Sequence, residues 1–345
     1  MDAEQFAQGR PPEQKTGTGQ SSLRVLVTGA SGFVGRAIVR ELVAQGHRPI
    51  CFVRSEAKLL AALPMSLRGS VGVREGDLFD ERQFAAAVGT TDAVIHCVGI
   101  LVEQPRQGQT FARIHVEATR RVVDACRAMG VRRLIHTSAM GTRPDAPTEY
   151  HRSKWASETI VRESGLDWTI FRPSIIHGPD GIFMQMMRRM ICDATVPAFG
   201  FIPIPLLFVP HLGDGESRVQ PVSVLDVAFC LVAALRKPEA ICQTYELGGP
   251  RAMSWREMYV ICRETMPGAR RWKPVIGQPV CLAKLAAKTV MKLPILPRLM
   301  RFNVDQVILS QEDSVCDTRP VEQTFGIKLR DFREELTQYA SSIPA

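Results

Sequence analysis

The stretch Leu23-Arg-Val-Leu-Val-Thr-Gly-Ala-Ser-Gly-Phe-Val-Gly35 joins an apolar, β-branched run to three closely spaced glycines. The run predicts a strand, and the glycines predict a tight turn into a helix. Because Gly29 and Gly32 lack side chains, a pyrophosphate can approach the free N–H groups and the positive dipole end of that helix. Gly35 would let the helix pack close to the strand. The stretch therefore predicts a dinucleotide-binding turn.

Composition sets the broad class of the protein. Of the 345 residues, 45% are hydrophobic and 23% are charged, as in a globular protein with a sizeable core. The nine cysteines are scattered and odd in number, and none forms a C-x-x-C pair. The sequence therefore predicts neither a disulfide framework nor a zinc site, and we expect no bound metal. Reduced thiols favour an intracellular, cytoplasmic location.

Hydropathy and charge exclude several other classes. Residues 1–22 are polar and rich in Gln, Gly and Pro, which predicts a disordered tail rather than a signal peptide. The longest apolar run, residues 202–209, is broken by prolines and is too short to span a bilayer. The net charge of +8 suits an anionic partner. The basic residues are dispersed and lack interleaved aromatics, so we expect no nucleic-acid binding.

Strands and helices alternate after the glycine turn. We expect helices at 36–45 and 117–129, each closed by a glycine, and further strands at 49–54, 71–78, 93–99 and 132–138. This alternation predicts an α/β fold with a doubly wound parallel sheet of the Rossmann type. We place the dinucleotide-binding domain at 23–176 and a smaller substrate or partner lobe at 177–345. Within that lobe, residues 213–250 are expected to return to the Rossmann domain.

The end of the second strand bears on which nucleotide binds. An acidic residue there hydrogen-bonds the ribose hydroxyls of NAD, whereas an arginine can pair with the 2′-phosphate of NADP. This position is Arg54, and no acidic residue follows until Glu56. NADP(H) is therefore favoured over NAD(H), the alternative being a solvated arginine. Asp77, at the end of the third strand, could hydrogen-bond the adenine amine, but it could equally stabilise a turn or cap a helix. Gly99, at the end of the strand at 93–99, permits close approach of the cofactor.

Candidate catalytic residues gather after the strand at 132–138. Ser138 ends that strand, and Tyr150-His-Arg-Ser-Lys154 follows twelve residues later. Tyr150 and Lys154 lie four apart and share a helix face, so the ammonium can lower the phenol pKa towards acid or base use. The lysine can also hold a nicotinamide ribose, and the serine can orient a substrate carbonyl or alcohol. Helix surfaces produce such a Tyr/Lys pair by chance, but the preceding serine and glycine turn make it informative.

These motifs resemble the extended and atypical branch of the short-chain dehydrogenase/reductase superfamily over roughly residues 23 to 340. The residues that carry the resemblance are Thr28–Gly35, Gly76–Leu78, Thr137–Gly141, Tyr150 with Lys154, Arg172–Pro179, Gly213–Ala228 and Tyr245–Gly249. Within that branch the chain is most similar to the NAD(P)H-binding accessory subunit of respiratory complex I and its bacterial relatives. That likeness rests on the passages Tyr150–Glu158, Ser164–Pro173 and Asp305–Leu309.

The resemblance implies roles for matching positions. The glycine turn would bind pyrophosphate, Arg54 the ribose phosphate, and Tyr150 and Lys154 the nicotinamide. The other positions implied to contact the cofactor are Gly29, Ser31, Gly32, Phe33, Val34, Gly35, Asp77, Leu78, Val98, Gly99, Pro173 and Ile176. Where many relatives have an asparagine that assists a proton-relay water, this chain has His115. A histidine there could serve the relay or be purely structural.

Two segments of the second lobe suggest attachment to a partner. Residues 177–212 form a Pro-, Met- and Phe-rich insertion that we expect to lie over the cofactor as a substrate loop, although packed core is the default interpretation. Residues 280–293 predict a basic amphipathic helix, with Lys284, Lys288 and Lys292 opposite Leu282, Leu285 and Leu293. A solvated face, an anionic lipid surface and an acidic partner all remain open. Residues 202–210 and 280–293 are thus the candidate contacts with a membrane or a respiratory complex.

Three functions follow from these observations. In the first, the chain is an NADP(H)-binding protein of the complex I accessory type, peripheral to the inner face of a respiratory membrane. In the second, it is an active NADP-dependent reductase or epimerase that acts on a lipophilic or sugar-like substrate through Tyr150. In the third, it is a regulator that senses the redox state of the dinucleotide.

Overall fold

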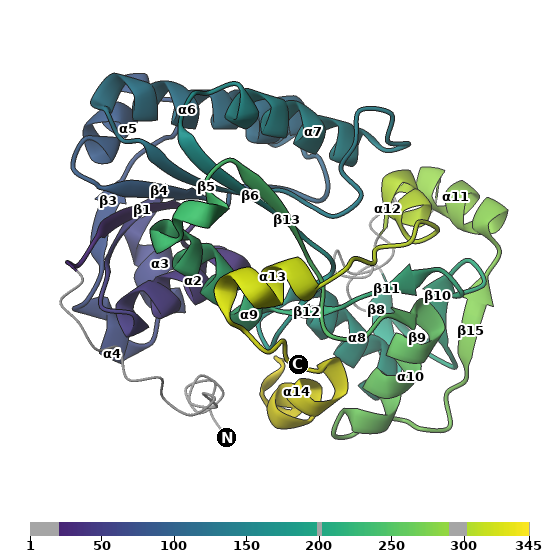
Figure 1. The fold of residues 1–345 in the computed structure, drawn as a ribbon. Coiled ribbons are helices and arrows are strands. Elements are labelled where there is room, and N and C mark those ends of the chain that lie inside the picture. The colour runs from purple at the N-terminus through teal and green to yellow at the C-terminus, as the bar shows by residue number, and fades with distance from the viewer. Residues whose placement is uncertain (1–20, 199–201, 290–301, 345) are drawn as a thin grey trace.

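The structure is a computed structural model that describes residues 21–198, 202–289 and 302–344. Its centre is a seven-stranded sheet (Figure 1). In spatial order the strands are β13 (Gln243–Leu247), β6 (Asp167–Pro173), β5 (Arg133–Thr137), β4 (Ala93–His96), β1 (Arg24–Thr28), β2 (Arg48–Val53) and β3 (Gly72–Glu75). All neighbouring strands run parallel. The predicted doubly wound sheet is confirmed.

The strand order reverses at β1, which lies between β2 and β4 although β2 and β3 precede β4 in the chain. In open α/β sheets, ligands bind beyond the carboxyl ends of the strands at such a reversal. The carboxyl ends of β1, β2 and β4 therefore mark the expected position of a bound dinucleotide.

Helices cover both faces of the sheet, and β1 shows why. Val25 and Val27 belong to one apolar core cluster, and Leu26 belongs to another. This follows from the two-residue period of a strand. The helices α2 (Phe33–Ala44) and α9 (Val224–Ala233) pack on the first face, whereas α5 (Glu81–Val88), α6 (Ala118–Met129) and α7 (Glu149–Arg162) cover the second (Figure 1). The short helices α3 (Glu56–Ala62) and α4 (Met65–Arg68) follow β2.

Several predicted boundaries differ from the structure. Helix α2 begins at Phe33 instead of Arg36 because Gly32 takes the extended N-cap conformation. Strands β3 and β4 end at Glu75 and His96, short of the predicted 78 and 99. The chain leaves the sheet there to form the rim of the candidate site. A π-helix at Ala112–Glu117, which was not predicted, leads into α6.

The second lobe is built on its own core. Its main elements are α8 (Ile182–Cys192), β8 (Thr195–Ala198), β9 (Ile202–Pro205), β10 (Val209–Leu212), α10 (Trp255–Thr265), β15 (Val275–Gln278), α11 (Val280–Lys288), α12 (Val304–Leu309) and α14 (Phe332–Tyr339). Short two-residue pairings join β7 (Ile176–His177) to β12 (Val222–Ser223) and β11 (Arg218–Val219) to β14 (Met253–Ser254). Helix α13 (Arg319–Phe325) packs against β13.

Two predictions for this lobe concern its core and one of its helices. The predicted substrate loop at 177–212 contains helix α8, and its Met184, Met187 and Met190 are buried in the lobe's core. These methionines fill packed core, which was the default interpretation of the segment. In the predicted basic helix, α11 buries Ala283 and Ala287, and Leu282 and Leu285 of the predicted apolar stripe are exposed.

Other predictions fall partly outside the described residues. The predicted tail at 1–22 lies outside them except for its last two residues, and residues 290–293 of the predicted basic helix lie outside them as well. All nine cysteines are free thiols. Among the residues that the structure describes, no helix is both long and apolar enough to cross a bilayer.

Candidate dinucleotide-binding site

The turn after β1 has room for glycine alone at its key positions. Gly29 has a φ of +75°, in the left-handed region, and a Cβ there would lie 3.0 Å from the Cys97 carbonyl oxygen. A Cβ on Gly35 would lie 2.1 Å from the Gly29 carbonyl oxygen, which is inside van der Waals contact. The Gly32 N–H donates to that same oxygen over 2.9 Å. The glycines thus bring the helix start against the strand end.

The start of α2 offers backbone N–H groups to a ligand. Gly32 has no side chain to cap the helix, and both Ser31 and Gly32 are exposed. The first N–H groups of a helix have no partner within it and, with the helix dipole, favour an anion. The ring of Phe33 packs on Gly178 and Gly181. Phe33 would therefore reach a pyrophosphate only through its backbone.

Arg36 connects this turn to the chain that follows β7. Its guanidinium donates to the Ser31 carbonyl over 3.0 Å and to Asp180 over 3.2 Å. Sequence reasoning did not single out either residue of this ion pair. Arg36 is not part of any family motif, and Asp180 lies 144 positions after it in the chain.

A cavity of about 390 Å³ opens at the carboxyl ends of β1, β2 and β4. Seven of the predicted cofactor positions line it, namely Gly29, Ser31, Arg54, Asp77, Leu78, Val98 and Gly99. The other predicted positions do not belong to its lining: Gly32, Phe33, Val34, Gly35, Ser138, Tyr150, Lys154, Pro173 and Ile176. The cavity has the position of the adenosine half of a dinucleotide site.

Sequence reasoning missed much of the cavity wall. The additional lining residues are Thr28, Phe52, Val53, Gly76, Phe79, Ile100, Gln107, Gly108, Gln109, Arg113, Ile114 and Ala118. Those from residues 100–118 belong to the connection after β4, to the π-helix and to the first residue of α6. A π-helix has no simple apolar period, so no apolar pattern in this segment could have predicted it. Phe79 could have been found, because it directly follows the Gly76–Leu78 motif.

Three charged residues line the cavity. Arg54 is exposed and has no hydrogen bond or ion pair among the described residues. Asp77 accepts the Phe79 N–H over 3.0 Å, so it stabilises a turn and also lines the cavity. The Arg113 guanidinium lies 4.3 Å from the centre of the Phe79 ring, a cation–π contact. The two arginines leave a net positive charge for an anionic ligand.

Lys154 is buried on α7 beside the end of β5. Its ammonium donates to the Thr137 carbonyl over 3.1 Å. Burial lowers the pKa of Lys154 to about 8, while the negative charge of Glu158 opposes that change. A Cβ on Gly99 would lie 3.2 Å from the Lys154 Nζ. Glycine at 99 therefore makes room for the lysine.

Tyr150 does not have the lowered pKa that we expected. Its ring lies among Phe111, His115 and His151, with centroid distances of 5.9, 5.6 and 5.2 Å. Burial raises the pKa of Tyr150 to about 12. The ammonium of Lys154 is engaged with the Thr137 carbonyl. The prediction that Lys154 lowers the pKa of the phenol is therefore wrong for this arrangement.

His115 has both ring nitrogens occupied. Its Nε2 accepts the Ile100 N–H over 3.1 Å, and its Nδ1 lies 2.8 Å from the Ser153 hydroxyl oxygen. That hydroxyl donates to the Tyr150 carbonyl, so Nδ1 is the donor to Ser153. Burial lowers the pKa of His115 to about 2. Of the two roles open for His115, the geometry supports a neutral structural bridge.

Two hydroxyl groups, those of Thr137 and Ser138, lie at the end of β5. Ser138 is buried, and its Oγ lies 3.5 Å from the Thr142 Oγ1. The neighbouring Thr137 Oγ1 is buried and has no hydrogen-bond partner among the described residues. Buried polar atoms are rarely left unpaired. A ligand hydroxyl at this strand end would satisfy Thr137.

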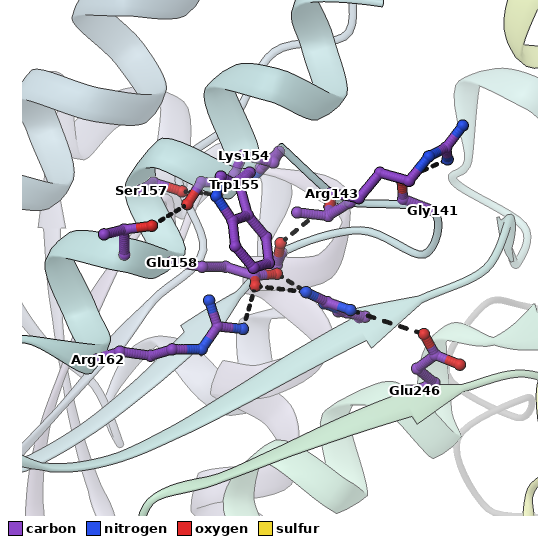
Figure 2. Close-up of polar contacts among 12 residues, drawn as sticks. Gly141, Arg143, Lys154, Trp155, Ser157, Glu158, Arg162 and Glu246 are labelled. Atoms are coloured by element: carbon purple, nitrogen blue, oxygen red, sulfur yellow. Dashed lines mark hydrogen bonds and ion pairs between the residues drawn. The ribbon is translucent and has the colours of Figure 1, made fainter. Parts of the chain in front are cut away.

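Glu158 anchors the helix that carries Tyr150 and Lys154 (Figure 2). Its fully buried carboxylate accepts hydrogen bonds from Arg172 over 2.8 and 2.7 Å and from Arg162 over 2.5 Å. Arg172 belongs to β6 and also lies 3.7 Å from Glu246 of β13. The cluster therefore fixes α7 to two strands of the sheet and places a negative charge one turn beyond Lys154.

Comparison with known proteins agrees with this geometry. The sequence model described as NAD(P)H-binding matches residues 29–187. The chain contains an NAD(P)H-binding domain. The matched region begins at the first glycine of the turn and ends within α8, so it includes the cavity and the Tyr150 helix.

Both a subunit of a respiratory complex and an enzyme are similar in sequence to this chain. NADH dehydrogenase (ubiquinone) 1 alpha subcomplex subunit 9 of Arabidopsis thaliana mitochondria is 29% identical, over 94% of this chain and 80% of its own length. The NAD(P)H azoreductase of Xenophilus azovorans is 28% identical, over 68% and 71%. The likeness to complex I accessory subunits is confirmed.

A solved structure shares the fold. The NADPH-dependent quinone oxidoreductase of Escherichia coli, complexed with NADPH, superposes with a TM-score of 0.66 and 17% identity. The match covers 91% of this chain and 99% of that chain. At this identity the likeness shows the Rossmann-type fold.

Proposed function

We propose that the chain binds NADP(H), in preference to NAD(H), with the adenosine half of the cofactor in the cavity beside β2. The residues present fit such a cofactor. Gly29 and Gly35 leave a cradle that a Cβ would fill, and the first turn of α2 has uncapped N–H groups. The unpaired Thr137 Oγ1 offers a partner for a ligand hydroxyl at the other end.

The observation that carries the preference is Arg54. It follows β2, lines the cavity and has no other partner among the residues described. A guanidinium matches the geometry of a phosphate and binds it in a bidentate manner. Asp77, the other charged group predicted to face the adenosine, lies two residues after β3 and already stabilises a turn. The 2′-phosphate of NADP(H) would therefore meet a positive charge at Arg54.

Calorimetric titration of Arg54→Gln with NADPH and NADH tests this assignment. We expect the affinity for NADPH to fall by about 10- to 100-fold, the loss of a charge-assisted hydrogen bond, while the affinity for NADH stays unchanged. Arg82→Gln removes an exposed arginine of α5 outside the cavity and serves as the matched control. An equal loss for both nucleotides would assign Arg54 to general electrostatic attraction instead.

The relatives support a place for this binding in a respiratory assembly. Alignment with the Arabidopsis subunit runs over 94% of the chain, so it includes the second lobe as well as the cofactor domain. We place the chain as an NADP(H)-binding accessory component at the surface of such an assembly. Co-purification of the untagged chain with NADH:quinone oxidoreductase activity on a gradient would test this, and migration only as a free protein would contradict it.

A second candidate function is a reductase or epimerase on a lipophilic or sugar-like substrate. The observation that favours it is the placement of Tyr150 and Lys154 on one helix beside Ser138 at the end of β5. Lys154 would hold the nicotinamide ribose, and the bound cofactor would supply hydride chemistry. NADPH oxidation with quinones or ketones, lost in Tyr150→Phe, would support this function.

A further inference from the structure

The outer edge of the second lobe carries exposed apolar side chains on consecutive elements. Leu282 and Leu285 on α11 are each 59% exposed, and Leu207, before β10, is 62% exposed. Trp272, before β15, is 60% exposed. We name this set, together with Ile276 and Phe208, the apolar edge. Isolated exposed leucines are common, but a series on adjacent elements marks an interaction surface.

The packing of these elements places the apolar edge along one strand pair and on the helix that follows it. Strands β10 and β15 pair in parallel, with Val209 opposite Val275, so Leu207 and Trp272 lie at the same end of the two strands. Leu212, at the other end of β10, packs with Ala283 of α11 in one small cluster. In Figure 1, β15 and α11 lie at the side of the lobe away from the seven-stranded sheet.

Helix α11 presents its large apolar residues to solvent. Ala283 and Ala287 are buried in a small cluster with Val307 of α12, and Val280 of α11 packs against that cluster. A helix that packs through alanines and exposes leucines is not stabilised by burial of those leucines. The exposed leucines are therefore available to another surface.

Charge around the apolar edge selects the kind of partner. Among the residues that the structure describes between Glu264 and Asp305, five are Lys or Arg and none is Asp or Glu. Lys273 is buried against backbone carbonyls, whereas Lys284 and Lys288 belong to the same helix as the exposed leucines. Neither of these two lysines makes an ion pair with a described residue. The surface thus combines apolar side chains with uncompensated positive charge.

We propose that the apolar edge docks on an anionic lipid surface, with α11 lying in the membrane interface. Leucines and a tryptophan bury into the boundary of the acyl chains, and lysines reach the phosphate groups, as in interfacial amphipathic helices. This inference deepens the proposed location at a respiratory assembly and rests on that proposal, but it does not depend on the cofactor site. The exposed apolar side chains are distributed over a helix and a strand pair, which suits a lipid interface.

Vesicle co-sedimentation of the full chain tests the proposal. We expect binding to mixed phosphatidylcholine/phosphatidylglycerol vesicles, weak binding to phosphatidylcholine alone, and loss of binding when salt reduces the screening length from about 10 Å to about 3 Å. The double variant Lys284→Glu/Lys288→Glu should bind at least 25-fold more weakly, from about fivefold per lysine. Leu282→Ser/Leu285→Ser should also lose binding.

Matched control variants distinguish an effect of this surface from an effect of the protein's net charge. Arg82→Glu/Arg120→Glu makes the same change in net charge on α5 and α6, and Met65→Ser removes an exposed methionine of α4 that is 75% exposed. Both controls should bind vesicles as the natural chain does. Retained NADPH binding by each variant would show that it is folded. Failure of the natural chain to bind anionic vesicles while it still binds NADPH would overturn the lipid proposal and leave the proposed cofactor binding intact.

Other occupants of the surface would appear as different outcomes. Binding to poly-glutamate without binding to anionic vesicles would show an acidic protein partner and overturn the proposal. Concentration-dependent dimerisation that Leu282→Ser/Leu285→Ser abolishes, without vesicle binding, would show a second copy of the chain there. Vesicle binding that the α11 variants leave intact would place the lipid contact elsewhere.

Discussion

The two halves of the proposed dinucleotide cleft differ in how their polar groups are held. In the adenosine half, Arg54 lines a cavity of about 390 Å³ without a partner among the residues described. In the nicotinamide half, Lys154 is bonded to the Thr137 carbonyl, and His115 is bonded through both ring nitrogens. Tyr150 is packed among aromatic rings and has a raised pKa. Lys154 and His115 are thus already hydrogen-bonded, whereas Arg54 is available to a ligand. On our proposal, the adenosine half therefore contributes most of the affinity for the cofactor.

A methyl group on Gly35 should have the largest effect on this comparison. In Gly35→Ala the new Cβ meets the Gly29 carbonyl oxygen at 2.1 Å and backbone of Ala30 at 2.8 Å. We expect α2 to move away from the turn, NADPH binding to weaken at least 100-fold, and the free energy of unfolding to fall by about 1–3 kcal/mol. Gly69→Ala is the control, since its Cβ would have no neighbour within 4 Å. NADPH binding of natural strength in Gly35→Ala would contradict the assigned turn.

Arg113 sharpens the comparison within the adenosine half. We expect Arg113→Gln to weaken the binding of NADPH and of NADH by a similar factor of about five. Arg113 stacks on Phe79 and lines the cavity. Its charge should attract both nucleotides, because it is not assigned to the 2′-phosphate that distinguishes them. Paired calorimetric titrations give both affinities. A loss confined to NADPH would instead assign the 2′-phosphate to Arg113.

The charge of Lys154 should make binding depend on pH. With a pKa of about 8, Lys154 is mainly protonated at neutral pH and loses its charge as the pH rises through that value. We expect NADPH affinity to fall about threefold to tenfold between pH 7 and pH 9.5, and Lys154→Met to remove this dependence. Glu158→Gln removes a charge that raises the lysine pKa, so the midpoint should move to lower pH. A flat profile for the natural chain would exclude Lys154 from the nucleotide contact.

Tyr150 should have the smallest effect on binding. Its hydroxyl makes no hydrogen bond with a described residue, and phenylalanine keeps the ring contacts. Tyr150→Phe should therefore bind NADPH within about twofold of the natural chain, as fluorescence titration can measure. A large loss would show that the phenol contacts the cofactor and would break the contrast between the two halves.

The sequence predicted the sheet because that information is local. Apolar runs such as 24–28 and 93–96 and the glycine turn between strand and helix are continuous in the chain, and their spacing determines the Rossmann order. Arg54 and Asp77 were found because each stands next to the end of a strand. Their positions in the cavity follow from parallel strands that end at one edge.

Other parts of the site arise from contacts that the sequence does not encode locally. Arg113 reaches the cavity through a π-helix, and Asp180 pairs with Arg36 across 144 positions. The pKa of Tyr150 was predicted with the wrong sign because spacing shows that Lys154 shares its helix face, but not that burial dominates. The exposure of Leu282 and Leu285 likewise depends on the alanines that α11 uses for packing.

Titration with the two halves of the cofactor tests the central claim most directly. If the adenosine half of the cleft holds the nucleotide, 2′,5′-ADP should bind the natural chain and lose affinity in Arg54→Gln, while nicotinamide mononucleotide should bind weakly or not at all. Calorimetry of both fragments under the same conditions gives the comparison. Tight binding of nicotinamide mononucleotide with no binding of 2′,5′-ADP would contradict the account.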